Sequence, residues 1–159
     1  MKHHHRLVAV AALAILALAG CGGSASGDLA SFKAPDGWRG GGIGGYSMWI
    51  SPDAKNGSGE VLMLMRLPYR SGSHQDLSMA TSQYQHAKVL QRKTIDICGK
   101  QPANYVEMAA DQKTGKHENV QLVSTRYNDT VYFAMYARDA GTPANPAANT
   151  AIRSLCLKH

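Results

Sequence analysis

The sequence of 159 residues lacks the patterns that would assign it to a common functional class. It has no H-E-x-x-H zinc motif, no G-x-S-x-G nucleophile motif, no C-x-x-C redox pair and no internal repeat. No stretch carries five or more basic residues, so the net charge of +6 is spread along the chain. We therefore expect a single non-catalytic domain with no cofactor and no nucleic-acid partner.

The first twenty residues have the pattern of an export signal. Met1–Arg6 is positively charged, and Leu7–Gly20 is a run of 14 apolar or small residues. A membrane-spanning helix needs about 20 apolar residues, so this run is too short to span and has the length of a signal-peptide core. It ends in Leu18-Ala19-Gly20-Cys21, which resembles the lipobox of bacterial lipoproteins.

The lipobox resemblance implies cleavage before Cys21 and attachment of diacylglycerol to the Cys21 thiol. Residues 1–20 are then a signal peptide, 21–30 a lipidated cysteine and flexible linker, and 31–159 a single domain. Loss of Lys2 and Arg6 with the leader lowers the net charge from +6 to +4. More than one acyl chain gives stable attachment without a transmembrane helix. We expect an extracytoplasmic protein, lipid-anchored to the cell membrane or the outer membrane.

The two remaining cysteines, Cys98 and Cys156, make an even pair in an exported chain. Disulfides form and persist in the oxidising compartments outside the cytoplasm. The 58 positions between them are unlike a redox pair, and closing such a loop stabilises a fold by roughly 4 kcal/mol. The sequence therefore predicts a structural Cys98–Cys156 disulfide, with two free buried thiols as the alternative.

Alternating and continuous apolar segments predict most of the secondary structure. A helix over 74–88 follows a capping pattern at Ser73 and Asp76, and a second helix begins with Asn145 as cap and Pro146 as first residue. The glycine run 40–45 is expected to be a mobile loop, since no helix follows it as in a phosphate-binding loop. The strands are expected at 32–35, 46–50, 60–67, 89–97, 103–110, 119–127 and 131–138. This order predicts an α+β fold, an antiparallel sheet of about six to seven strands flanked by helices.

Two short motifs and the order of elements resemble the PsbP-like fold, which includes LpqN-type bacterial lipoproteins. The motifs are Phe32-x-x-Pro35-x-Gly37-Trp38 and the turn Cys98-Gly99-x-x-Pro102-Ala103. The resemblance covers nearly all of residues 30–158 and implies an α/β/α sandwich. It implies no particular activity, since one fold serves many functions.

Candidate binding residues lie on the last predicted strand. Tyr132 and Tyr136 share one face, and they could line a ligand groove with Arg138 at its rim. The alternative is that both rings pack under a helix.

Two residue types are candidates for metal binding. Thioethers select Cu(I), and Met63 and Met65 share a strand face, but methionine also fills irregular cores, which we favour here. A zinc site would have to gather His74, His86, His117 and His159 from distant segments, so we expect solvated histidines and no metal. The leading hypothesis is a non-catalytic binding or accessory module of the cell envelope with a possible protein partner. The alternative is a small-ligand or copper-binding protein.

Overall fold

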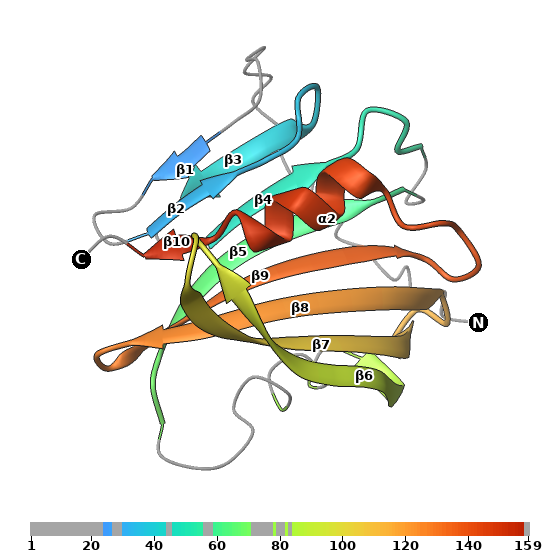
Figure 1. The fold of residues 1–159 in the computed structure, drawn as a ribbon. Helices are drawn as coiled ribbons and strands as arrows, with labels where there is room; N and C mark the ends of the chain where they lie inside the picture. The colour runs from blue at the N-terminus through green and yellow to red at the C-terminus, as the bar shows by residue number, and fades with distance from the viewer. Residues whose placement is uncertain are drawn as a thin grey trace, which may run out of the picture.

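The computed structural model describes residues 24–26, 30–43, 46–55, 59–70, 78, 82 and 84–157. Its main feature is a seven-stranded antiparallel sheet, here the large sheet, with strand order β3-β4-β5-β9-β8-β7-β6 (Figure 1). The strands are β3 (Arg39–Ile43), β4 (Tyr46–Ile50), β5 (Val61–Pro68), β6 (Tyr84–Ile97), β7 (Gln101–Gln112), β8 (His117–Tyr127) and β9 (Thr130–Asp139). This confirms the predicted antiparallel sheet.

A small sheet and one helix lie on the large sheet. The small sheet has the order β1-β2-β10, from β1 (Ser24–Ser26), β2 (Ala30–Lys33) and β10 (Cys156–Leu157). The helix α2 (Pro146–Arg153) lies beside it, and Figure 1 shows both in front of the large sheet. We call the covered side of the large sheet the helix face. In the part of the chain that the structure describes, no helix is long and apolar enough to cross a membrane.

Strand β9 shows how the large sheet is buried on both sides. Successive side chains of a strand point to opposite faces. Tyr132, Ala134 and Tyr136 therefore join a core cluster with α2 and the small sheet, through residues such as Phe32, Ile152 and Leu157. Val131, Phe133, Met135 and Ala137 join a second cluster with Met65 and Met108. We call this second side the methionine face.

Helix α2 begins where the sequence predicts. Asn145 is the cap, and its side-chain oxygen accepts a hydrogen bond from the Ala147 N–H at 2.9 Å. Pro146 takes the first helical position, where its missing N–H leaves no bond unmade. The inward residues Ala148, Ala151 and Ile152 are fully buried. The helix ends at Arg153, so Cys156 lies in β10 rather than at the helix end.

Cys98 and Cys156 form a disulfide, with their Cα atoms 5.0 Å apart. Cys98 follows β6 at its turn into β7, and Cys156 pairs with Ser31 in the small sheet. The bond therefore ties the small sheet, and the end of α2 just before it, to one corner of the large sheet. The predicted pairing is confirmed.

The glycine run departs from the expectation of a mobile loop. Residues 39–43 form β3, an edge strand paired with β4, while Gly44 and Gly45 lie outside the described residues. A Cβ added to Gly40 would collide with the Met48 carbonyl, and one added to Gly42 would collide with the Ser47 side chain. The glycines therefore permit close approach of β3 to β4 rather than loop motion.

Two other expectations are wrong in part. The helix predicted over 74–88 is contradicted at its end, since Tyr84–Lys88 belongs to β6. Within the predicted helix, Ser78 and Ser82 are helical. The other residues of 74–83 lie outside the described residues. With one described helix on one face, the predicted flanking by helices is only partly seen. In the expected linker 21–30, residues 24–26 form β1, which pairs with β2. Pairing satisfies the backbone groups of this polar segment, which composition alone did not indicate.

Candidate functional site

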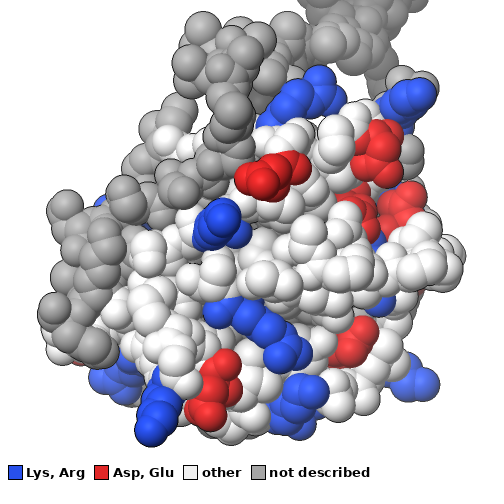
Figure 2. Space-filling view, turned by 45° about the horizontal axis from the view of Figure 1, so that its top comes forward, with Lys and Arg blue, Asp and Glu red and all other residues white. Residues whose placement is uncertain are grey.

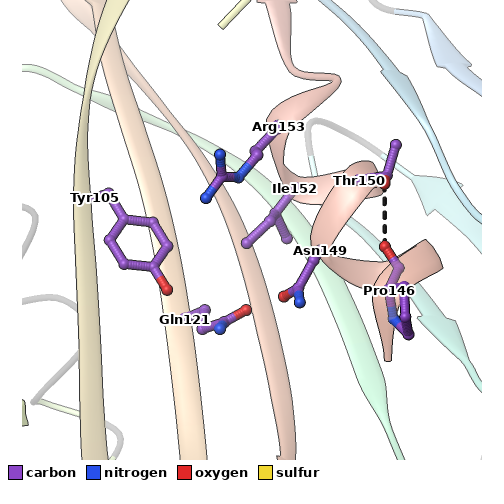
Figure 3. A pocket seen from close by; sticks show the side chains of 7 residues that line it. All are labelled: Tyr105, Gln121, Pro146, Asn149, Thr150, Ile152 and Arg153. Carbon is purple, nitrogen blue, oxygen red and sulfur yellow. Dashed lines mark hydrogen bonds between the residues drawn. The ribbon is translucent and has the colours of Figure 1, made fainter. Parts of the chain in front are cut away.

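A groove lies on the helix face between α2 and strands β7 and β8; we call it the α2 groove. Its volume is about 360 Å³, within the range of small-molecule sites. Strands β7 and β8 provide Tyr105 and Gln121, and α2 provides the other wall. Figure 3 shows Pro146, Asn149, Thr150, Ile152 and Arg153 of that wall, with Thr150 donating its hydroxyl to the Pro146 carbonyl.

Gln121 is the most unusual residue of the α2 groove. It lies in the apolar segment Val120–Val123 of β8, is 6% exposed, and its Oε1 has no hydrogen-bond partner among the described residues. In Figure 3 its amide points toward the side chain of Asn149. A buried polar atom without a partner is costly and rare in native proteins, so Gln121 is a candidate for ligand contact.

Tyr105 forms the opposite wall of the groove and is held in its protonated form. Its hydroxyl donates to Glu107 Oε2 at 3.4 Å. Burial, and after it the nearby Glu107 carboxylate, raises the pKa of Tyr105 to about 12. At neutral pH Tyr105 is therefore a hydrogen-bond donor and not a base.

Cationic side chains surround Tyr105. Arg153 lies over its ring with Cζ 5.9 Å from the centroid, and Lys93 Nζ lies 5.1 Å from the same centroid. Arg138 contacts Glu107 at 3.7 Å between Nη2 and Oε1, while its buried Nη1 has no partner among the described residues. Two of these cations lie over the Tyr105 ring and the third contacts the Glu107 carboxylate, so the surroundings of Tyr105 carry more positive than negative charge.

The structure keeps the three residues that the sequence singled out for binding on one face of β9, with Arg138 Cζ 5.7 Å from the centroid of the Tyr136 ring, but none of them lines the α2 groove. Tyr132 is buried in the core of the helix face and does not line the α2 groove. Tyr136 is fully buried, with its hydroxyl donating to Glu60 Oε1 at 2.5 Å and accepting from the Asn145 N–H at 3.0 Å. Arg138 contacts Glu107, whose carboxylate accepts the Tyr105 hydroxyl, and also donates from Nε to the Thr142 carbonyl at 3.1 Å.

Glu60, Tyr136 and Asn145 form a polar clasp at the start of α2. Glu60 Oε2 also accepts from the Asn145 side-chain amide at 2.9 Å, so the carboxylate bonds to both partners. Burial, followed by the Glu60 hydrogen bond, raises the pKa of Tyr136 and keeps its hydroxyl protonated. The clasp fixes the N-terminal end of α2 and with it one wall of the groove.

The methionines of the described residues gather on the methionine face. Met48, Met63 and Met135 are direct neighbours across β4, β5 and β9, and Met65 and Met108 lie in the buried cluster of this face. The Tyr46 hydroxyl donates to Met63 Sδ at 3.2 Å and contacts Met48 Sδ at 3.7 Å. This arrangement favours packing as the role of these methionines. Met79 lies outside the described residues.

Two of the four histidines that lie outside the expected signal peptide meet on one carboxylate. His117 Nδ1 lies 2.5 Å from Asp111 Oδ1, and His86 Nδ1 lies 3.2 Å from Asp111 Oδ2. These hydrogen bonds, with that of His117 the stronger, lower the pKa of Asp111. Among the described residues no group of three His, Cys, Asp or Glu side chains could hold a metal ion. His74, His159 and Cys21 lie outside the described residues.

The charges of the surface in Figure 2 do not form a field of one sign. Lysine and arginine side chains alternate with acidic ones over the described part of this face. A duplex-binding surface would gather cations along one stripe. The positive charge that matters for the α2 groove is therefore local and arises from the few side chains around Tyr105.

Comparison with known proteins adds information on the fold. No protein-family model and no curated protein sequence matches the chain. A solved structure from Bacteroides thetaiotaomicron has a TM-score of 0.52 at 14% identity, covering 82% of this chain, which spans only 45% of that protein. A protein of unknown function from Pseudomonas aeruginosa has a TM-score of 0.50 at 15% identity. The match covers 76% of this chain and 85% of the Pseudomonas chain.

The cyanobacterial PsbP (CyanoP) of Synechocystis sp. PCC 6803 is also similar. Its TM-score is 0.51 at 14% identity, and the match covers 81% of this chain and 86% of that one. The chain therefore has a PsbP-like fold, as the sequence motifs indicated. At this level of identity the likeness concerns the fold alone.

Proposed function

We propose that the protein is a lipid-anchored, extracytoplasmic binding module of the cell envelope that holds its partner in the α2 groove and catalyses no reaction. The observation that supports this most directly is Gln121, which lines the groove and whose buried Oε1 has no hydrogen-bond partner among the described residues. Leaving such an atom without a partner costs about 1–3 kcal/mol, a cost that a hydrogen bond from a bound partner would remove.

The chemistry of the groove supports binding rather than catalysis. Its polar lining consists of two amides, a threonine hydroxyl, an arginine and a tyrosine whose pKa is about 12. General acid–base catalysis at neutral pH works best with a group that titrates near that pH, and none of these lining groups does. Amides and guanidinium groups are well suited to orient a polar partner through directional hydrogen bonds.

The proposed anchor would place the domain close to the membrane. Only Gly22 and Gly23 separate Cys21 from the first residue of β1. Three residue steps of extended chain reach about 10 Å, so a lipidated Cys21 would hold the small sheet near the headgroups. The module would then meet partners at the membrane surface rather than at a distance from it.

The anchor is tested by comparing the native sequence with Cys21→Ser in a bacterial host. We expect the native chain in the membrane fraction with an intact mass that starts at Cys21 and includes acyl chains. The variant should leave the membrane fraction. A full-length, unacylated native chain starting at Met1 would contradict the anchor.

The groove is tested by photo-crosslinking in the same host. A benzophenone amino acid is placed at Thr150, on the groove wall, or at Thr114, an exposed residue of the β7–β8 turn, as the matched control. We expect an adduct in the membrane fraction from position 150 and none from position 114. Adducts of equal yield at both positions, or none at position 150, would refute the groove as the binding surface.

A further inference from the structure

We propose that the α2 groove binds a small organic anion that also carries several hydroxyl groups, of the size and polarity of a sugar acid. This inference rests on the proposed function and specifies its ligand. It draws on three features of the groove, namely its local charge, its pattern of donors and acceptors, and its volume.

The charge of the groove selects for an anion. Arg153 is exposed on the last turn of α2, and Lys93 approaches the Tyr105 ring from β6. Glu107 is the one carboxylate that contacts Tyr105 among the described residues, and Arg138 lies beside it at 3.7 Å. With that carboxylate partnered, Arg153 and Lys93 attract a carboxylate or another anionic group of a ligand, and Arg153 can bind it in bidentate fashion.

The amides select for hydroxyl groups. Gln121 Oε1 needs a donor, and a ligand that carries only a carboxylate has none to offer. Asn149 borders Gln121 and offers both a donor and an acceptor, a combination that a hydroxyl group matches. A ligand hydroxyl reaches Gln121 Oε1 once the half-buried Asn149 side chain turns aside, and the bond then satisfies an atom that is otherwise unpaired.

The volume limits the ligand to one small molecule. About 360 Å³ is near the lower end of the range of about 300–1,000 Å³ for small-molecule sites. Ile152 and the Tyr105 ring supply the apolar parts of the lining, against which the face of a saturated ring can pack. A single six-membered ring with an acidic substituent fits this combination of size, apolar face and polar rim.

Three probes of equal ring size test the proposal on the whole mature domain. These are glucuronate, glucose, which lacks the charge, and cyclohexanecarboxylate, which lacks the hydroxyls. Binding is measured by calorimetry at low salt, together with the side-chain amide NMR signals of Gln121 and Asn149. We expect glucuronate to bind at least tenfold more tightly than either other probe and to shift both amide signals.

Three variants locate the site. Arg153→Gln should weaken glucuronate binding by about tenfold or more, because a hydrogen-bonded ion pair is lost. Gln121→Met, which keeps the side-chain length, should weaken glucuronate and leave cyclohexanecarboxylate unchanged. Arg126→Gln is the matched control, since Arg126 is a half-exposed arginine of β8 stacked on Tyr69 at the methionine face.

The outcomes separate this inference from the proposed function. Glucuronate binding that fails to exceed that of both other probes overturns the hydroxylated-anion ligand, as does equal weakening by Arg153→Gln and Arg126→Gln. If crosslinking at position 150 still succeeds in that case, the groove remains a binding surface for another class of partner. If crosslinking also fails, the proposed function falls with the inference.

Discussion

The helix face and the methionine face of the large sheet are both buried, but they treat polar groups differently. On the helix face, Glu107, Gln121 and Tyr136 are direct neighbours across β7, β8 and β9, and a groove opens beside them. At the same level on the methionine face, Val106, Leu122 and Met135 form an apolar row. At this level of the sheet, one face therefore carries directional groups that can recognise a partner, and the other carries flexible side chains that fill space. Glu118, a buried polar residue of the methionine face, lies near the start of β8 and is bonded to Gln112 and Lys116.

The difference shows that a buried polar group can have either of two roles. The clasp of Glu60, Tyr136 and Asn145 uses its hydrogen-bonding capacity within the protein and fixes the start of α2. Gln121, on the same face, has no hydrogen-bond partner for its Oε1 among the described residues. The clasp is structural, whereas Gln121 has the role of ligand contact in our proposal.

Removing the disulfide should have the largest effect on the helix face. We expect the double variant Cys98→Ser, Cys156→Ser to lose roughly 4 kcal/mol of unfolding free energy, on the loop-closure estimate for the 58-residue separation. Urea unfolding followed by tryptophan fluorescence measures the loss, since Trp49 belongs to the core of the helix face. The reduced native chain should match the double variant. An unchanged midpoint would show that the bond does not hold α2 and β10 in place.

The methionine face should respond to volume rather than to sulfur. Met135 is 2% exposed, so Met135→Ala should cost about 3 kcal/mol through loss of buried surface and the cavity left behind. Met135→Leu keeps the volume and should cost less than about 1.5 kcal/mol. Metal analysis of the native chain, purified without chelators, accompanies these measurements. One equivalent of copper, lost in Met135→Leu, would replace packing with metal binding as the role of this face.

Weakening the clasp should have an intermediate effect. Tyr136→Phe removes a hydroxyl that bonds both Glu60 and Asn145, so we expect a loss of about 1–3 kcal/mol. Thermal unfolding measures the change. Tyr46→Phe serves as control, because Tyr46 is 43% exposed and its hydroxyl contacts only sulfur atoms. Equal effects of the two variants would remove the distinction between clasp and surface.

The smallest expected effect on stability comes from Asp111, near the end of β7. Because His117 and His86 hydrogen-bond to this carboxylate, its pKa lies below the ordinary value. The lowered pKa means that ionised Asp111 stabilises the folded state. This contribution is complete above the pKa of an unfolded aspartate and is lost as the pH falls through the lowered pKa of the folded state. His117→Gln should raise the pKa of Asp111 in a carboxyl-carbon NMR titration, and His86→Gln should raise it less. A pKa that stays constant in both variants would rule out the histidines as the cause.

The sequence predicts most of the large sheet because its signals are local. Strand β4 has the predicted bounds, the turn at Asn128 has the positive φ of 51° that a tight hairpin uses, and the Asn145 cap and Pro146 begin α2. The disulfide is predicted because Cys98 and Cys156 are the two cysteines that remain once Cys21 is assigned to the expected lipid anchor of an exported chain. Each of these features depends on a few neighbouring residues or on a count.

The errors come from tertiary contacts that local patterns do not record. The glycines of β3 suggested a loop because glycine is flexible in isolation, yet they serve close packing against β4. Residues 84–88 fit a helical pattern, but pairing with β7 makes them a strand that contains two register shifts. β1 gains its pairing from β2, within a segment whose composition is that of a linker.

The α2 groove could be predicted only in part. Gln121 carries a signal, since an amide inside an apolar strand requires a partner. Arg138 is instead predicted at the rim of a groove lined by Tyr132 and Tyr136, and none of these three residues lines the α2 groove. Tyr105, Asn149 and Arg153 carry no local signal, because they become neighbours only when α2 packs across β7 and β8. Tyr136 shows the converse. The sequence suggested it as a binding residue, but its hydroxyl is already bonded to Glu60 and Asn145 in the clasp.

The stability of Gln121→Met tests most directly whether the α2 groove is a binding site. If Gln121 is retained for a ligand, replacing it with an apolar side chain of equal length removes an unpaired buried oxygen and leaves the unfolding free energy unchanged or up to about 1 kcal/mol higher. Glucuronate binding should weaken in the same protein. A loss of about 1 kcal/mol or more in urea unfolding would instead show that Gln121 is structural, and would contradict the account.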